Sequence, residues 1–177
     1  MDARYRIVPA GPEHIGKLPG IELTAATMFP PGRIPESNYP NSVPHGVFVT
    51  AAREDRLLVA VETGSGEPVG FALNAFGCKY ALLSELDVLP EHGRRGIGRE
   101  LVRRVGEKVR VLGYTHLHLT TFSDFPWNAP FYATLGFETV PEDEMPELLQ
   151  HILADERARG FINRVAMRLR LDQTTAG

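Results

Sequence analysis

Cysteine is nearly absent from this sequence, and so is any long apolar run. The single cysteine, Cys78, cannot form an internal disulfide or a cysteine-based zinc site. This scarcity is typical of proteins in a reducing compartment, and we expect a cytoplasmic protein. No window approaches the roughly 20 apolar residues that a transmembrane helix requires. The segment after Met1 also lacks the apolar core of a secretory signal, so we expect no membrane partner.

An excess of charge of either sign is also missing. The 19 Lys and Arg residues stand against 22 Asp and Glu, which gives a formal net charge of -3. Domains that bind nucleic acid usually carry a basic excess, so we expect no nucleic-acid partner. The chain has 177 residues, of which 43% are hydrophobic, and this is enough to bury a core. We predict one domain over residues 1–171 and a disordered tail over residues 172–177.

The hydrophobic pattern predicts strands and helices that alternate along most of the chain. A helix is expected over residues 11–29, interrupted or bent near Pro19 and Gly20, and a loop over Pro30–His45. Strands are expected over residues 5–10, 56–63, 68–77, 80–89, 115–122, 137–140 and 164–171. Further helices are expected over residues 46–55, 96–113, 128–136 and 141–160. This order predicts an α/β fold with three α/β/α layers around a mixed, largely antiparallel central sheet.

The junction between the strand at 80–89 and the helix at 96–113 is rich in glycine and arginine. It contains Gly93, Gly96 and Gly98 among Arg94, Arg95 and Arg99. The first turn of a helix has unpaired N–H groups and the positive end of the helix dipole, and phosphates bind there. Glycine lets the backbone come close to such a ligand. A basic turn followed by a solvated helix face remains the alternative, and neither the Rossmann nor the Walker spacing is present.

Two separated motifs resemble one known family. The stretch "LDVLPEHGRRGIGRELV", followed by "NAPFYATLGF", resembles the GNAT superfamily of acyl-CoA-dependent N-acyltransferases. The resemblance extends over residues 5–171 and is strongest over residues 86–137. It implies a GNAT-like sheet that is splayed between its fourth and fifth strands. Gly93 departs from the family pattern, which usually has Gln or Arg at this position.

The resemblance implies acetyl-CoA as co-substrate and no metal. The main chain of Leu86, Asp87 and Val88 would pair with the pantetheine arm, as an added strand would. The loop and the start of the helix would hold the pyrophosphate through Arg94, Arg95, Gly96, Ile97, Gly98 and Arg99. Asn128 stands near the position of an asparagine that is frequent in the family, and we include it among the residues that bind the co-substrate.

The resemblance also implies the catalytic groups. Tyr132 aligns with the general acid of the family, and a phenol with a pKa of about 10 can protonate a leaving thiolate. A packed helical tyrosine is the alternative. Glu85 is the candidate base, and we expect Asp87 to face the other way; an exposed strand carboxylate is the alternative for both. The backbone N–H of Val88 is the candidate oxyanion donor.

Three other features have weaker functional interpretations. His116 and His118 share one face of a strand, but no third ligand is evident, so we expect no metal site there. Phe125 and Trp127 could either line an acceptor pocket or anchor a loop. The loop at Pro30–Pro44 is the candidate substrate lid.

These features together predict an acetyl-CoA-dependent N-acetyltransferase that moves an acetyl group directly to a primary amine. The sequence does not identify the acceptor, which could be a small molecule or a peptide, and a homodimer is compatible with it. Transfer of another acyl group, or transfer to a hydroxyl, is an alternative within the enzymes. A non-catalytic acyl-CoA-binding sensor or interaction module is the alternative outside them. The presence of Tyr132 together with a nearby acidic residue favours an enzyme.

Overall fold

The computed structural model describes residues 1–35 and 43–171. The chain divides into two compact units. The first contains Met1–Ala75 and Leu83–Glu107, and the second contains Phe76–Leu82 and the chain from Lys108 onward. The predicted tail and residues 36–42 of the predicted lid lie outside the described residues. The single domain over residues 1–171 stays a prediction.

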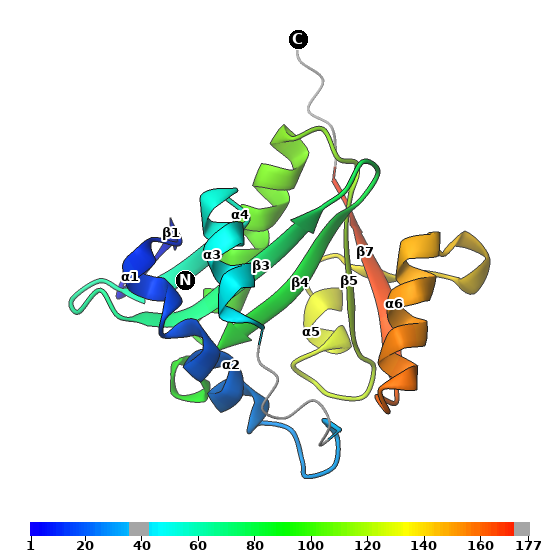
Figure 1. The fold of residues 1–177 in the computed structure, drawn as a ribbon, viewed down its shortest axis with the longest axis horizontal. Helices are drawn as coiled ribbons and strands as arrows, with labels where there is room; N and C mark the ends of the chain where they lie inside the picture. The colour runs from blue at the N-terminus through cyan, green and yellow to red at the C-terminus, as the bar shows by residue number, and fades with distance from the viewer. Residues whose placement is uncertain (36–42, 172–177) are drawn as a thin grey trace. The chain divides into compact units, whose positions relative to one another are not determined.

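Seven strands form one sheet in the order β1-β2-β3-β4-β5-β7-β6 (Figure 1). Their bounds are β1 Tyr5–Pro9, β2 Leu57–Glu62, β3 Pro68–Phe76, β4 Ala81–Val88, β5 His116–Phe122, β6 Glu138–Thr139 and β7 Arg164–Arg170. Pairing is antiparallel between β1 and β2, β2 and β3, β5 and β7, and β6 and β7. The sheet is therefore mixed and largely antiparallel, as predicted.

The parallel pair joins the fourth and fifth strands. Its ladder contains Ala81 opposite Leu117 and Leu82 opposite His118, at the very start of β4. Pairing that is confined to the start of β4 agrees with a sheet that is splayed between its fourth and fifth strands. The GNAT-like fold class predicted from the sequence is thus confirmed.

The helices agree with the predicted ranges except at two places. They are α1 Pro12–Ile15, α2 Leu18–Ala26, α3 His45–Arg53, α4 Ile97–Val111, α5 Ala129–Ala133 and α6 Glu147–Ala158. The first helical region breaks before Leu18 rather than at Pro19, because proline is tolerated in the first turn of α2. The last helix begins only after Pro146, and a short 3₁₀ turn at Glu142–Glu144 precedes it.

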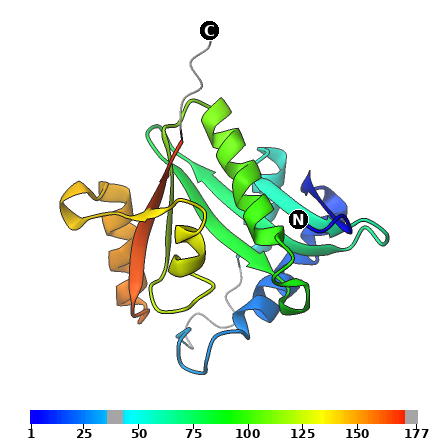
Figure 2. The same cartoon turned by 180° about the vertical axis from the view of Figure 1, so that it is seen from behind.

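The core of the first unit lies between α1, α2 and α3 and one face of β2 and β3. Leu57, Val59 and Val61 of β2 pack there with Phe48 of α3 and Phe71 of β3. The intervening β2 residues point to the opposite face, because side chains alternate along a strand. Figure 2 shows α4 on that opposite face. The helix buries one stripe, made up of Ile97, Leu101, Val102, Val105 and Val109.

The second unit buries α6 against β7. Leu149 of α6 packs on Ala166 of β7 and on Val140. Beside this cluster, the buried carboxylate of Glu156 accepts a hydrogen bond from Arg164 at 2.7 Å and another from Thr120 Oγ1 at 2.7 Å. Among the described residues of both units, no helix is long and apolar enough to cross a bilayer.

Candidate functional site

The loop between β4 and α4 is built from residues with unusual backbone angles. A 3₁₀ turn at Pro90–His92 follows β4, and the N–H of Gly93 donates to Pro90 O at 3.0 Å. Arg94 and Gly96 then adopt left-handed conformations, with φ of 56° and 79°. A left-handed φ is sterically unfavourable for arginine. The contacts around the loop, and not the backbone preference of Arg94 alone, therefore hold this conformation.

The start of α4 presents a row of backbone donors. In the part of the chain that the structure describes, the N–H groups of residues 94–98 donate to no backbone carbonyl, and the first helical bond runs from Glu100 N to Gly96 O at 3.0 Å. These donors point out of the positive end of a 15-residue helix. Such an arrangement can bind the oxygens of a phosphate or pyrophosphate.

Gly96 has a second reason to be glycine. A Cβ placed there would lie 3.1 Å from Met1 Cα, and the N–H of Asp2 donates to Arg95 O at 3.2 Å. The first residues of the chain therefore pack directly against the loop. A bulky side chain at Gly96 would disturb this contact as well as any ligand.

The arginines of the loop differ in their exposure. The Arg95 guanidinium donates to Glu91 O at 3.1 Å, which holds it against the 3₁₀ turn. Arg94 and Arg99 are exposed beside the loop. Arg94 is therefore better placed than Arg95 to reach an additional phosphate on a ligand.

The C-terminal half of β4 lies against β3 at Gly70. A Cβ at Gly70 would lie 2.6 Å from Asp87 O and 3.2 Å from Val88 Cα, so only glycine allows this approach. β4 pairs with β5 only at Ala81 and Leu82. Both residues precede Leu86–Val88, which are predicted to bind the pantetheine arm.

The carboxylates of β4 do not lie as predicted. Glu85 and Asp87 are two residues apart, and residues two apart on a strand share a face. The expectation that Asp87 faces away from Glu85 is therefore wrong. Burial raises the pKa of Asp87 well above its usual range, and the nearby Glu85 and Glu22 carboxylates raise it further. Asp87 Oδ2 is closed to solvent and has no hydrogen-bond partner among the described residues.

Glu22 is a residue of this region that the sequence did not indicate. It lies on α2, where the N–H of Val43 donates to its Oε2 at 2.8 Å. Burial raises its pKa, and the hydrogen bond from Val43 opposes that rise. No local motif marks Glu22, because its proximity to Asp87 depends on how α2 packs on the sheet.

The second unit holds the other two predicted residues. Asn128 is the N-cap of α5, its Nδ2 donates to Thr121 Oγ1 at 3.0 Å, and its backbone O accepts from Tyr132 N at 3.0 Å. Tyr132 is 8% exposed and packs against Phe131 and Phe137, with ring centroids 5.2 and 5.5 Å away. The structure thus fixes the Tyr132 ring firmly within its own unit.

The predicted site residues therefore fall into two groups. Residues 85–99 come together in the first unit, and Asn128 and Tyr132 come together in the second. Asn128 Oδ1 is buried without a hydrogen-bond partner among the described residues, so this amide keeps an unused acceptor.

The remaining candidates are histidine and aromatic side chains of the second unit. His116 and His118 lie with ring centroids 5.9 Å apart, and Tyr80 packs edge-on against His118. Within residues 1–35 and 43–171, no group of three or more His, Cys, Asp or Glu could hold a metal ion. Phe125 and Trp127 stack on each other with centroids 5.2 Å apart.

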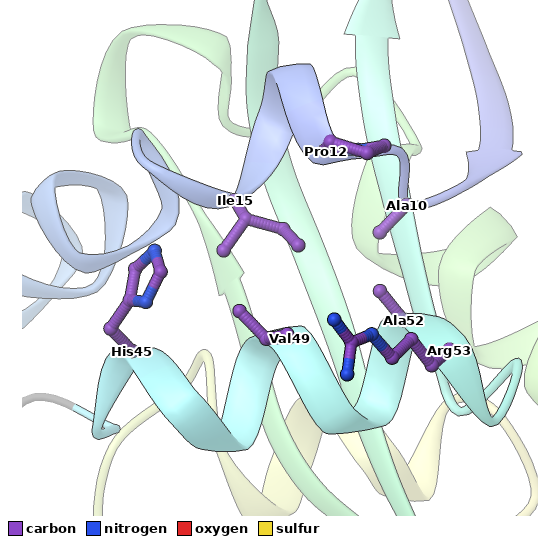
Figure 3. Close-up of a pocket in the computed structure, with 7 residues that line it drawn as sticks. All are labelled: Ala10, Pro12, Ile15, His45, Val49, Ala52 and Arg53. Carbon is purple, nitrogen blue, oxygen red and sulfur yellow. The ribbon is translucent and has the colours of Figure 1, made fainter.

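One further hollow lies between α1 and α3, with a volume of about 450 Å³. It is lined by Ala10, Pro12, Ile15, His45, Val49, Ala52 and Arg53 (Figure 3). Its walls are mostly apolar, and its two basic side chains stand at the two ends of α3. It contains none of the predicted site residues.

Comparison with known proteins agrees with this geometry. The sequence family described as acetyltransferase (GNAT) domain matches residues 53–139, a range that includes β4, the loop, the start of α4 and Tyr132. The PaiA N-acetyltransferase from Thermoplasma acidophilum, solved with coenzyme A, is 16% identical with a TM-score of 0.64, over 94% of this chain and 98% of that one. The ribosomal-protein-S18-alanine N-acetyltransferase from Escherichia coli is 15% identical with a TM-score of 0.65, over 98% and 97% of the two chains.

A larger protein shares the fold as well. N-acetylglutamate synthase from Neisseria gonorrhoeae, solved with coenzyme A and N-acetyl-glutamate, is 20% identical with a TM-score of 0.68 over 97% of this chain. The chain spans only 36% of that protein. A GNAT acetyltransferase domain therefore matches residues 53–139 of this chain, and the chain has the fold of N-acetyltransferases of known structure.

Proposed function

We propose that the protein transfers the acetyl group of acetyl-CoA directly to a primary amine of a small-molecule or peptide acceptor. The observation that carries this proposal is the row of N–H groups over residues 94–98, which donate to no backbone carbonyl among the described residues and lie at the positive end of α4, after β4. A pyrophosphate fits such a row, because backbone donors and the helix dipole both favour an anion there. The reducing cytoplasm, indicated by a single exposed Cys78, is the compartment we assign.

Acetyl-CoA supplies a thioester, whose carbonyl carbon gains a bond to the amine nitrogen as its bond to sulfur breaks. The loop amides over residues 94–98, with Arg94 at their edge, hold the pyrophosphate side of this co-substrate. The main chain of Leu86–Val88 aligns its pantetheine arm, and the N–H of Val88 stabilises the oxyanion. Asn128, whose Oδ1 has no hydrogen-bond partner among the described residues, is a further proposed polar contact of the co-substrate.

Two proton transfers complete the reaction. A β4 carboxylate, Glu85 in our assignment, takes a proton from the acceptor ammonium so that a neutral amine attacks. The Tyr132 hydroxyl gives a proton to the departing thiolate, and its ring is held by Phe131 and Phe137. The products are an amide, free CoA and one proton. The nitrogen loses two protons in all: the first passes through Glu85 to solvent, and the second, lost from the tetrahedral intermediate, balances the one that Tyr132 gives to the thiolate.

Donor binding is tested by thermal shift. Acetyl-CoA should raise the melting temperature of the native protein through linkage. Gly98→Val places a branched side chain in the first turn of α4 and should remove that rise. Gly64→Val is the matched control, because a Cβ at Gly64 meets nothing within 4 Å in the β2–β3 turn. An absent shift in the native protein at millimolar acetyl-CoA would contradict the proposal.

A further inference from the structure

The first residues of the chain pack against the loop between β4 and α4. They form a tight turn, in which the N–H of Tyr5 donates to Asp2 O at 3.1 Å. The Arg4 guanidinium closes this turn, because it lies 2.8 Å from Asp2 Oδ2. Figure 2 shows these residues beside the start of α4, in agreement with the contact of Met1 there. We call residues 1–5 the N-terminal turn.

Two hydrogen bonds join the N-terminal turn to the loop. The Tyr5 hydroxyl and His92 Nδ1 lie 2.9 Å apart, and the two rings meet edge to face. The N–H of Asp2 donates to Arg95 O at 3.2 Å. Among the described residues, residues 90–96 form no other hydrogen bond with a part of the chain beyond the β4–α4 connection and α4 itself. The loop therefore receives its outside hydrogen bonds from the N-terminal turn.

The position of Tyr5 follows from the register of the sheet. Val61 of β2 packs toward α1, α2 and α3. The next residue, Glu62, points to the opposite face, and so does Tyr5, which pairs with Glu62. Tyr5 is 3% exposed, so its ring is held by burial on the side of α4. A buried tyrosine hydroxyl needs a hydrogen-bond partner, and His92 supplies it.

The loop needs support from outside because its own conformation is unfavourable. Arg94 has a left-handed φ of 56°, and a residue with a Cβ keeps such a φ only when its surroundings hold it. Arg94 lies between His92 and Arg95, which are the two residues that the N-terminal turn holds. The N–H groups proposed to bind the pyrophosphate begin at the same residue. The two hydrogen bonds therefore act on the part of the loop in which these donors must be aligned.

We propose that Tyr5 and His92 are positioning residues of the coenzyme A site, whose hydrogen bond keeps the loop in its binding conformation before the ligand arrives. The inference rests on the proposed function, because it concerns the same loop. The ligand binds only the fraction of molecules whose loop has the binding conformation, so the affinity falls as that fraction falls. One hydrogen bond between uncharged groups changes such an equilibrium by up to about tenfold.

Calorimetric titration with CoA, at a temperature well below the melting temperature, tests this role without an acceptor. Tyr5→Phe keeps the buried ring and deletes only the hydroxyl, and we expect it to lower the CoA affinity by about three- to tenfold. His92→Leu should cause a similar loss. His92→Asn keeps a hydrogen-bonding atom close to the position of Nδ1 and should restore most of the affinity. Tyr114→Phe is the matched control, because the Tyr114 hydroxyl donates to Gly77 O at 2.7 Å in the second unit, and the CoA affinity should not change.

A double variant distinguishes one shared hydrogen bond from two independent effects. If Tyr5 and His92 act through their common bond, Tyr5→Phe with His92→Leu should weaken CoA binding no more than either single change. The same variants should raise KM for acetyl-CoA and leave kcat nearly unchanged, because saturating co-substrate draws the loop into its binding conformation. A purely structural role would lower the melting temperature and leave the CoA affinity of the folded protein as it is.

The outcomes separate this inference from the proposed function. An unchanged CoA affinity in Tyr5→Phe, or losses that add in the double variant, would overturn the positioning role and leave acetyl transfer intact. If Tyr5→Phe does not fold, the comparison of His92→Leu with His92→Asn decides, since His92 is only half-buried. If CoA binds but no amine is acetylated, acetyl transfer is lost and the affinities of the variants still decide the positioning role. If the native protein binds no CoA, both are overturned.

Discussion

Replacing Asp87 by asparagine should make the protein more stable near neutral pH. The change keeps the size of the side chain and deletes only its charge. In the native protein this carboxyl is half-buried, it feels the charges of Glu22 and Glu85, and its Oδ2 is closed to solvent and has no hydrogen-bond partner among the described residues. A buried polar group left unsatisfied costs about 1–3 kcal/mol, and more when it is charged. We therefore expect Asp87→Asn to gain about 1–3 kcal/mol near neutral pH.

The gain should depend on pH in a defined direction. Because the folded pKa of Asp87 lies above the unfolded value of 3.8, the folded state binds the proton more tightly. The stability that the native protein derives from this proton is fully present below the unfolded pKa and is lost as pH rises through the folded pKa. The difference between variant and native protein should be small near pH ~4 and should grow as pH rises.

Thermal unfolding of both proteins between about pH 4 and pH 8 measures this difference. In a chain of this size each kcal/mol moves the melting temperature by about 2–4 °C. Asp143→Asn, at an exposed position of the 3₁₀ turn, is the control and should show no such trend. A variant that is less stable than the native protein at every pH, or a gain that does not change with pH, would refute the reasoning. It would mean that Asp87 has a compensating partner.

Three more predictions follow from named contacts. Tyr132→Phe keeps the ring packing and should lower turnover by about 10²-fold, the low end for a general acid, with unchanged acetyl-CoA affinity; native-like turnover would leave Tyr132 a packing residue. Arg94→Ala should lower the affinity for CoA more than the affinity for dephospho-CoA, as expected if Arg94 contacts the 3′-phosphate. The difference should be smaller for Arg95→Ala, since Glu91 O holds the Arg95 guanidinium. If calorimetry gives equal losses of affinity for the two ligands with Arg94→Ala, Arg94 does not contact the 3′-phosphate. Hydrogen bonds from Arg103 chiefly lower the pKa of Glu100 from 4.5 to about 2, so its stabilisation is present above pH 4.5 and is lost as pH falls toward 2. Because solvent screens this exposed pair, the stabilisation amounts to about 1 kcal/mol or less. Glu100→Gln should therefore lower the melting temperature at neutral pH but not near pH ~2. An equal loss at both pH values would contradict the role of the Arg103–Glu100 hydrogen bonds.

Features set by local chemistry could be predicted from the sequence. The glycine and arginine pattern after β4 predicted the loop, and the structure gives Arg94 and Gly96 the left-handed angles that such a turn requires. The period of apolar residues predicted α4 and its buried stripe. The start of the last helix was placed too early, because Pro146 caps the helix and the preceding acidic residues form a 3₁₀ turn.

Features set by long-range packing could not be predicted. Glu22 lies far from Asp87 along the chain, and only the packing of α2 on the sheet brings their charges together. The contact of Met1 with Gly96 is also invisible in a local motif, although it decides how a substitution at Gly96 must be interpreted. The sequence does predict that Glu85 and Asp87 lie on the same face of the strand, because side chains alternate along a strand with a period of two residues.

The most direct test of the account is release of CoA from acetyl-CoA in the presence of a panel of primary amines, with the amine product identified by mass spectrometry. We predict that at least one amine gives one acetylated product for each CoA released. Turnover should fall by about 10²-fold in Tyr132→Phe. If acetyl-CoA raises the melting temperature but no amine in the panel releases CoA above the protein-free rate, the central claim of acetyl transfer is contradicted and the protein is a binder of acyl-CoA.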